Sequence, residues 1–201
     1  SDYDKRDYME KLGIDCEVKI NPRSFVSEKK CDVKSKRFLM ATRFVYAKGL
    51  DLMMESFEEF CKEDSEWELD IIGDGDLFDQ IRADAKKRHL EKRVHFVGYT
   101  NEPEKYYLNS SVFLLPSRWE GWPMVIMEAF EFGLPVIAFH MGAMDLIIDD
   151  GKTGFLPEAF DPHKFAQAML KLAHDEELRA RMSANAIAKS DDFSIDKAVK
   201  E

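Results

Sequence analysis

Two glutamates, Glu120 and Glu128, stand eight positions apart in a stretch that reads RWEGWPMVIMEAF. The neighbours of Glu128 in the chain are apolar, and a buried carboxylate is costly unless it has a partner or is neutralised. One partner would be a pair of vicinal hydroxyl groups, because the acidic residue of nucleotide-binding folds accepts hydrogen bonds from ribose in this way. The alternative is an internal cation such as Arg43 or Arg118, and one carboxylate could hold both. The spacing leaves these alternatives open.

The segment around Glu120 favours a ligand site, because a helix is expected over residues 123–132. A proline suits the first helical position, and the next two N–H groups are then free to face an anion. Gly121 lets the backbone approach a ligand closely. The candidate ligand-binding residues of this segment are Gly121, Trp122, Pro123, Met124 and Val125.

Two cations flank the loop that follows the first expected strand. Arg43 and Lys48 lie at its two ends, and Gly49 opens the next helix. A forked guanidinium and an ammonium near a helix N-terminus suit a diphosphate. A pair of solvated loop cations would show the same spacing, so both interpretations stay open.

Two further loops also follow expected strands. Residues 73–76 read GDGD, which matches the start of a dinucleotide fingerprint, but the third glycine is absent and Asp74 and Asp76 would repel a pyrophosphate. We therefore expect a tight turn with Asp76 as the helix N-cap. In the other loop, Gly98 precedes Tyr99, whose ring could stack on a base or lie half-buried.

The order of apolar patterns predicts the elements that must position these loops. Strands are expected over residues 37–41, 68–72, 93–97, 111–115, 134–138 and 153–156, and helices over 49–62, 76–89, 102–108, 123–132, 162–174 and 176–189. Short β-branched or aromatic runs separated by helices indicate an α/β, Rossmann-like parallel sheet of about six strands with helices on both faces. Such sheets bind ligands outside the carboxyl ends of their strands, where all four loops lie.

Composition narrows the class of protein. The 201 residues suffice for one substantial domain, and the net charge of -10 comes without a basic stripe that would indicate nucleic acid. Three cysteines and five scattered histidines show no metal-like spacing, which favours a reducing, cytosolic setting and predicts no metal. No apolar run approaches the ~20 residues of a membrane span, and no signal peptide is evident. The chain starts with Ser1 and stops in mid-pattern, so we expect a fragment.

Taken together, these residues resemble the C-terminal, donor-binding half of a GT-B-fold retaining glycosyltransferase of group 1, also called family 4. The similarity covers about residues 36 to 190. Four stretches in the same order carry it: 42–49, 73–75, 116–128 with its Glu-x7-Glu pair, and 133–138 together with 150–155. The resemblance implies a nucleotide-sugar-binding domain over residues 36–201, an interdomain linker or edge segment over 1–35, and an N-terminal acceptor domain that is absent from this chain.

The resemblance also implies roles for individual residues. Arg43 and Lys48 would grip the donor diphosphate, Glu128 would bind the ribose hydroxyls and Glu120 would face the donor sugar. Glu120, Arg43 and Lys48 would be the catalytic residues. The other donor-binding residues that it implies are Gly98, Tyr99, Gly121, Trp122, Pro123, Met124 and Val125. The sugar stays open, because residues 141–145 read MGAMD where the family often has Gly-Gly and then Glu.

The expected activity is transfer of a sugar, with retention, from a nucleotide diphosphate donor, UDP-linked by preference. The acceptor would be a glycan or lipid-linked acceptor, bound through the absent domain, in polysaccharide biosynthesis. We expect no cofactor or metal, a cytoplasmic location that allows peripheral contact with the inner face of the membrane, and little activity from this chain alone. The alternatives are a non-catalytic nucleotide-sugar-binding or docking module and a GT-B nucleotide-sugar epimerase. A phosphorylase would need a lysine-bound pyridoxal cofactor, for which no dedicated motif is evident.

Overall fold

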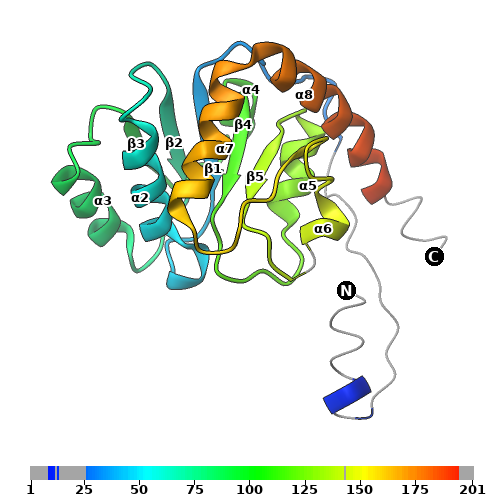
Figure 1. Cartoon of the computed structure of the whole chain (residues 1–201), viewed down its shortest axis with the longest axis horizontal. Coiled ribbons are helices and arrows are strands. Elements are labelled where there is room, and N and C mark those ends of the chain that lie inside the picture. The colour runs from blue at the N-terminus through cyan, green and yellow to red at the C-terminus, as the bar shows by residue number, and fades with distance from the viewer. Residues whose placement is uncertain (1–8, 12, 14–25, 143, 195–201) are drawn as a thin grey trace.

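The computed structural model describes residues 9–11, 13, 26–142 and 144–194, and it is an α/β domain built on one sheet (Figure 1). Six parallel strands pair in the order β3-β2-β1-β4-β5-β6. They are β1 Arg37–Ala41, β2 Glu68–Ile72, β3 Val94–Gly98, β4 Val112–Leu115, β5 Val136–Ala138 and β6 Gly154–Phe155. The predicted Rossmann-like parallel sheet is confirmed. Cys16 and most of the expected linker over residues 1–35 lie outside the described residues.

Helices follow the strands in the predicted alternation. They are α2 Leu50–Phe60, α3 Phe78–Lys87, α4 Glu104–Leu108, α5 Met124–Glu131, α6 Met144–Ile147, α7 Pro162–His174 and α8 Glu176–Ser190. Two short 3-10 helices, η1 Tyr46–Lys48 and η2 Asp191–Phe193, and the single turn of α6 had not been predicted. Such short elements carry too little apolar periodicity to stand out in a sequence.

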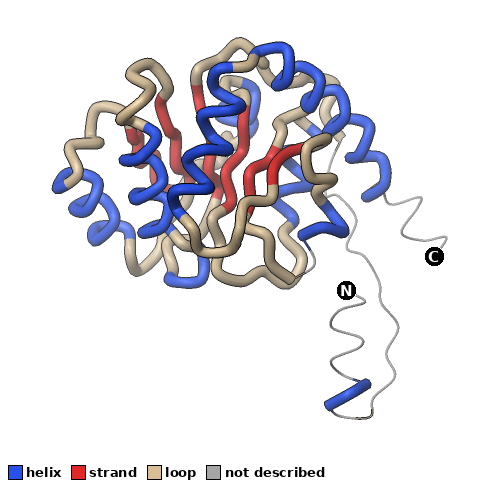
Figure 2. The backbone as a smooth tube through the Cα atoms, viewed as in Figure 1, coloured by secondary structure: helices blue, strands red, loops and turns tan. Residues whose placement is uncertain are grey.

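The two faces of the sheet have separate cores. Figure 2 shows the strands lying between helices. Successive residues of a strand point to opposite faces. Phe38 and Met40 therefore pack against the face that carries α2, α3 and α7. Leu39, between them in the chain, packs on the other face with residues of α4, α5 and α6. These strands are buried on both sides, which explains why they are continuous apolar runs.

The order of the strands reverses between β1 and β4, which pair with each other at the centre of the sheet. From β1 the chain moves to β2 and β3 on one side, and from β4 it moves to β5 and β6 on the other. The loops after β1 and β4 therefore lie at the switch point, the place where open α/β sheets bind their ligands. The two loops also touch. Gly49 has a left-handed φ of 63°, and a Cβ built on it would lie 1.9 Å from the carbonyl oxygen of Pro116.

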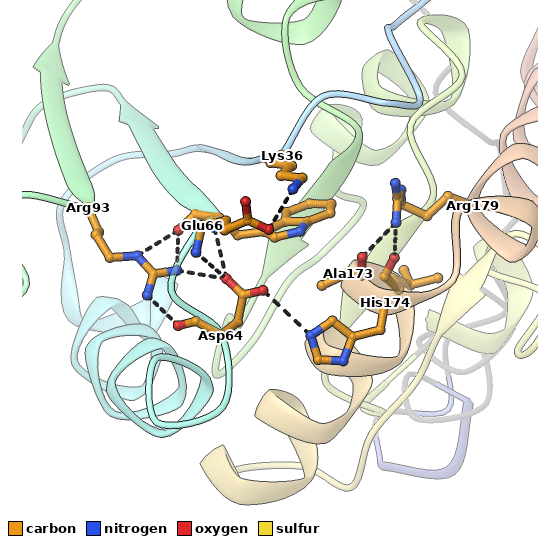
Figure 3. A network of polar contacts seen from close by, with 9 residues as sticks. Lys36, Asp64, Glu66, Arg93, Ala173, His174 and Arg179 are labelled. Atoms are coloured by element: carbon orange, nitrogen blue, oxygen red, sulfur yellow. Dashed lines mark hydrogen bonds and ion pairs between the residues drawn. The ribbon is translucent and has the colours of Figure 1, made fainter.

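At the other end of the strands, where β2 and β3 begin, a network of polar contacts joins these two strands to the end of α7 (Figure 3). The carboxylate of Asp64, between α2 and β2, accepts hydrogen bonds of 2.8 Å from the N–H groups of Glu66 and Trp67. Arg93, just before β3, donates to the carbonyl oxygen of Trp67 at 2.8 Å and to the Asp64 carboxylate at 3.1 Å. His174, at the end of α7, lies 3.5 Å from the same carboxylate. The network therefore anchors the start of two strands to the end of a helix.

Two local predictions about helix starts were wrong. Asp76 is not an N-cap: α3 begins at Phe78, and Leu77 occupies the N-cap position without a side-chain hydrogen bond. The turn is closed instead by Asp74, whose carboxylate accepts a hydrogen bond of 2.7 Å from the N–H of Gly75. Pro123 is the N-cap residue of α5 rather than its first helical residue, because its ψ of 92° is extended.

Candidate functional site

Lys48 and Glu120 meet at the switch point, although 72 positions separate them in the chain. The Lys48 ammonium lies 2.7 Å from each carboxylate oxygen of Glu120. The hydroxyl of Ser117 donates a further hydrogen bond of 2.6 Å to the same carboxylate. The side chains of Lys48 and Glu120 are 19% and 8% exposed. Two of the three predicted catalytic residues therefore form one largely buried ion pair at the expected edge of the sheet.

Arg43, the third predicted catalytic residue, lies in the same loop as Lys48 and is exposed. Its guanidinium forms no hydrogen bond or ion pair with any residue in the described part of the chain. A cation at the mouth of a loop with no internal partner is available to an anionic ligand, and its planar fork suits phosphate oxygens.

Glu128 has a partner that differs from both predicted cations. Its carboxylate accepts a hydrogen bond of 2.9 Å from the hydroxyl of Tyr107, a buried residue of α4. The Tyr107 ring stacks on Phe132 with ring centroids 4.9 Å apart. Burial raises the pKa of Glu128, and the hydrogen bond from Tyr107 offsets part of this rise. The alternative of an internal cation as the partner is not what the described residues show, and the sequence could not point to Tyr107 because it does not reveal that α4 lies beside α5.

Glu128 also faces a hollow of about 960 Å³. Its walls come from residues 26–29, from 101–105 and α4, and from Phe132 of the turn after α5. Tyr107 lines it beside Glu128, whereas Lys48 and Glu120 do not. The structure thus joins Lys48 to Glu120. It places Glu128 between one and two turns after the start of α5, on the wall of a separate hollow.

The remaining predicted residues line the same edge of the sheet. Tyr99 is 77% exposed, so the half-buried alternative for its ring was wrong. Gly121 is exposed, and a Cβ built on it would meet no atom within 4 Å, which leaves its backbone open to a ligand. The Trp122 ring packs against Phe193 of η2 at 6.2 Å between ring centroids. At the N-terminus of α5, the N-cap makes no side-chain hydrogen bond with the N–H groups of Met124 and Val125.

Sequence reasoning missed the second glutamate of α5. Glu131 is 2% exposed, and its carboxylate accepts a hydrogen bond of 2.8 Å from the N–H of Ser27. The Lys30 ammonium lies 3.1 Å from the same carboxylate, and the Ser190 hydroxyl donates to it at 3.3 Å. Glu131 stands in the same apolar run as Glu128, so the argument from burial applied to it equally. Its role here is to hold residues 27–30 and the end of α8 against α5.

The structure also bears on metals and membranes within the described residues. No group of three or more His, Cys, Asp or Glu side chains there is arranged to hold a metal ion. Among those same residues, no helix combines the length and the apolar character needed to span a membrane.

The site lies at the switch point of an open parallel α/β sheet, which is where sheets of this kind bind their ligands. A sequence profile of the family described as "Glycosyl transferases group 1" matches residues 24–189. This match covers most of the chain, and the chain belongs to that family. The predicted family and its Rossmann-like, GT-B-type domain are confirmed.

Known proteins of the family resemble the chain over most of its length. An uncharacterized glycosyltransferase of Haemophilus influenzae is 30% identical over 183 residues, which are 90% of this chain and 52% of that protein. The poly(ribitol-phosphate) alpha-N-acetylglucosaminyltransferase of Staphylococcus aureus is 31% identical over 72% of this chain and 30% of its own length. The chain therefore spans about half or less of these relatives.

A solved structure supports the fold. It is a mutant of S. aureus TarM in complex with Fondaparinux, alpha-GlcNAc-glycerol and UDP. The TM-score is 0.86 with 24% sequence identity, and the match covers 100% of this chain and 41% of TarM. At that identity the similarity concerns the fold alone.

Proposed function

We propose that this chain is the donor-binding domain of a retaining glycosyltransferase. The longer enzyme would move a sugar from a nucleotide diphosphate donor, UDP-linked by preference, to a glycan or lipid-linked acceptor in polysaccharide biosynthesis. The observation that carries the proposal is the Lys48–Glu120 pair at the switch point, with the unpaired guanidinium of Arg43 in the same loop. The names of the S. aureus relative and of the UDP complex support this class of donor and acceptor.

The difficult part of this chemistry is the negative charge that builds on the leaving diphosphate. Arg43, Lys48 and the N-terminus of α5 supply positive potential at one edge of the sheet, and they do so without a metal ion. Preorganised groups of this kind lower the barrier because they need no rearrangement during the reaction. The loss of one of them typically raises the barrier by about 3 to 4 kcal/mol.

Lys48 and Glu120 have complementary roles in this proposal. Each neutralises the other, so neither of these largely buried charges is left uncompensated. When a diphosphate enters, the ammonium gains a second acceptor and the Glu120 carboxylate is free to face the donor sugar. Glu128, one to two turns along α5, would accept hydrogen bonds from ribose hydroxyls through the oxygen that Tyr107 leaves free.

Calorimetric titration of this chain with UDP, GDP and ADP, without added metal, tests the donor site. We expect selective binding of UDP, and we expect Glu128→Ala to weaken it about tenfold or more, since hydrogen bonds to a charged group contribute about 1.5 to 3 kcal/mol. Glu102→Ala is the matched control, because Glu102 is an exposed acid that lines the same hollow. Absence of binding by all three diphosphates, or equal losses in the two variants, would contradict the proposal.

A further inference from the structure

Arg118 connects the loop after β4 to the segment between β1 and α2. Its backbone N–H donates to the carbonyl oxygen of Ala47 at 2.7 Å, and its guanidinium donates to that of Tyr46 at 3.0 Å. The same guanidinium forms two parallel hydrogen bonds, of 2.7 and 2.6 Å, with the carboxylate of Asp51. It also lies over the Tyr46 ring, 4.0 Å from the ring centre. The Arg118 side chain thus contacts three groups between η1 and the first turn of α2, and its backbone N–H binds a fourth.

These contacts enclose Lys48 on both sides along the chain. Tyr46 and Ala47 precede it in η1, and Asp51 follows it in the first turn of α2. Arg118 itself stands two residues before Glu120, the partner of Lys48. The backbone around Lys48 and the backbone before Glu120 are therefore tied together independently of the Lys48–Glu120 ion pair.

The two hydrogen bonds between Arg118 and Asp51 restrict the orientation of both side chains. An arginine and a carboxylate that share two parallel hydrogen bonds are fixed in orientation as well as in distance, which a single lysine contact would not achieve. The Arg118 side chain is only 15% exposed. The Asp51 pKa is held below its usual value, first of all by the hydrogen bonds from Arg118. The pair is therefore charged and formed at neutral pH.

We propose that Arg118 and Asp51 are a positioning pair that holds Lys48 in place to bind the diphosphate of the donor. The inference rests on the proposed function. Neither side chain contacts the donor in this proposal. Asp51 acts through Arg118 on the backbone that carries Lys48. Small displacements of a positioned group are costly to binding and catalysis, even when the substitution that causes them is remote.

The first test compares UDP with uridine on the intact chain. Asp51→Asn keeps the shape of the side chain and removes its charge, and we expect it to raise the Kd for UDP about tenfold. The Kd for uridine, which lacks the diphosphate, stays unchanged. Asp51→Glu restores part of the UDP affinity, because it restores the carboxylate. Asp79→Asn is the matched control, since Asp79 is an exposed acid in the first turn of α3.

The second test asks whether Asp51 acts through Lys48. In a Lys48→Met background we expect Asp51→Asn to have no further effect on UDP affinity, which ligand-observed NMR can follow even when binding is weak. An equal loss in both backgrounds, an equal loss for uridine, or no loss in the single variant would overturn the inference. Failure of the unmodified chain to bind UDP would overturn the proposed function and this inference with it. Binding that Asp51→Asn leaves unchanged would overturn the inference alone.

Discussion

Where the strands begin, Asp64 and Arg93 are bound largely by backbone groups (Figure 3). Where the strands end, by contrast, Lys48 and Glu120 are bound mainly by one another. Backbone partners belong to the turns themselves, so the first network cannot exchange its contacts without unfolding those turns. A pair of flexible side chains can exchange one partner for a ligand. We therefore expect the network of charges where the strands begin to serve stability, and the pair where they end to bind a ligand.

Loss of Asp64 should give the largest effect on stability. Asp64→Ala removes the carboxylate that accepts from the N–H groups of Glu66 and Trp67 and from the Arg93 guanidinium, which should lower the free energy of unfolding by about 3 kcal/mol. Urea denaturation measures this. Glu66→Ala is the control, because Glu66 forms an exposed ion pair with Lys36 and should change the free energy by at most about 1 kcal/mol. Similar losses in the two variants would contradict the closed network.

The same variant has a pH signature. Burial raises the pKa of Asp64, but the N–H groups of Trp67 and Glu66 and the charge of Arg93 outweigh it and leave the pKa below its usual value. A carboxylate with a depressed folded-state pKa contributes stability above its unfolded pKa of about 4, and this is lost as the pH falls through the folded value. The free energies of unfolding of the unmodified chain and of Asp64→Ala should therefore become more similar as the pH falls below about 4.

Replacement of Lys48 should show the opposite balance between stability and binding. Lys48→Met removes a charged contact with the diphosphate, and we expect UDP affinity to fall about 10- to 150-fold, the equivalent of about 1.5 to 3 kcal/mol. Lys48→Met leaves the largely buried Glu120 carboxylate with the Ser117 hydroxyl but no cation. Stability is therefore compared in Lys48→Met/Glu120→Gln, which carries no uncompensated charge and whose free energy of unfolding should fall less than that of Asp64→Ala. Calorimetry and urea denaturation measure both. A large loss of stability with unchanged UDP affinity would show that this pair is also purely structural.

The raised pKa of Glu128 predicts a smaller effect that depends on pH. Hydroxyl donors of a ribose favour the ionised carboxylate, so protonation competes with the ligand. UDP affinity should fall as the pH is lowered from neutrality toward 4.5, the ordinary value from which burial raises this pKa. In Glu128→Gln this part of the pH dependence should disappear. A profile that is identical in the two proteins would show that Glu128 does not contact the nucleotide.

His174 should contribute least. Its ring is 55% exposed and lies 3.5 Å from the Asp64 carboxylate, so the contact is a surface ion pair only when the ring is protonated. His174→Gln should change the free energy of unfolding by less than about 1 kcal/mol at neutral pH, as surface pairs usually do. A loss comparable with that of Asp64→Ala would show that the network depends on the end of α7.

Much of the fold could be predicted from local patterns. Phe38, Leu39 and Met40 form a continuous apolar run because both faces of β1 are buried, and this pattern marks a central parallel strand. The order of strands and helices follows from such runs, and the loops after strands could be singled out as ligand sites for the same reason. Local patterns could not predict the last one or two residues of each element, the cap of α3 or the short elements, because these depend on single hydrogen bonds.

The sequence by itself determined which residues stand at the carboxyl ends of the strands, among them Arg43, Lys48 and Glu120, because local periodicity sets where a strand ends. The tertiary structure alone decided their partners. Lys48 meets Glu120 because β1 and β4 pair at the centre of the sheet, and Glu128 meets Tyr107 because α4 lies beside α5. A charge identifies the kind of partner it needs, but only the packing of distant elements determines which residue supplies it.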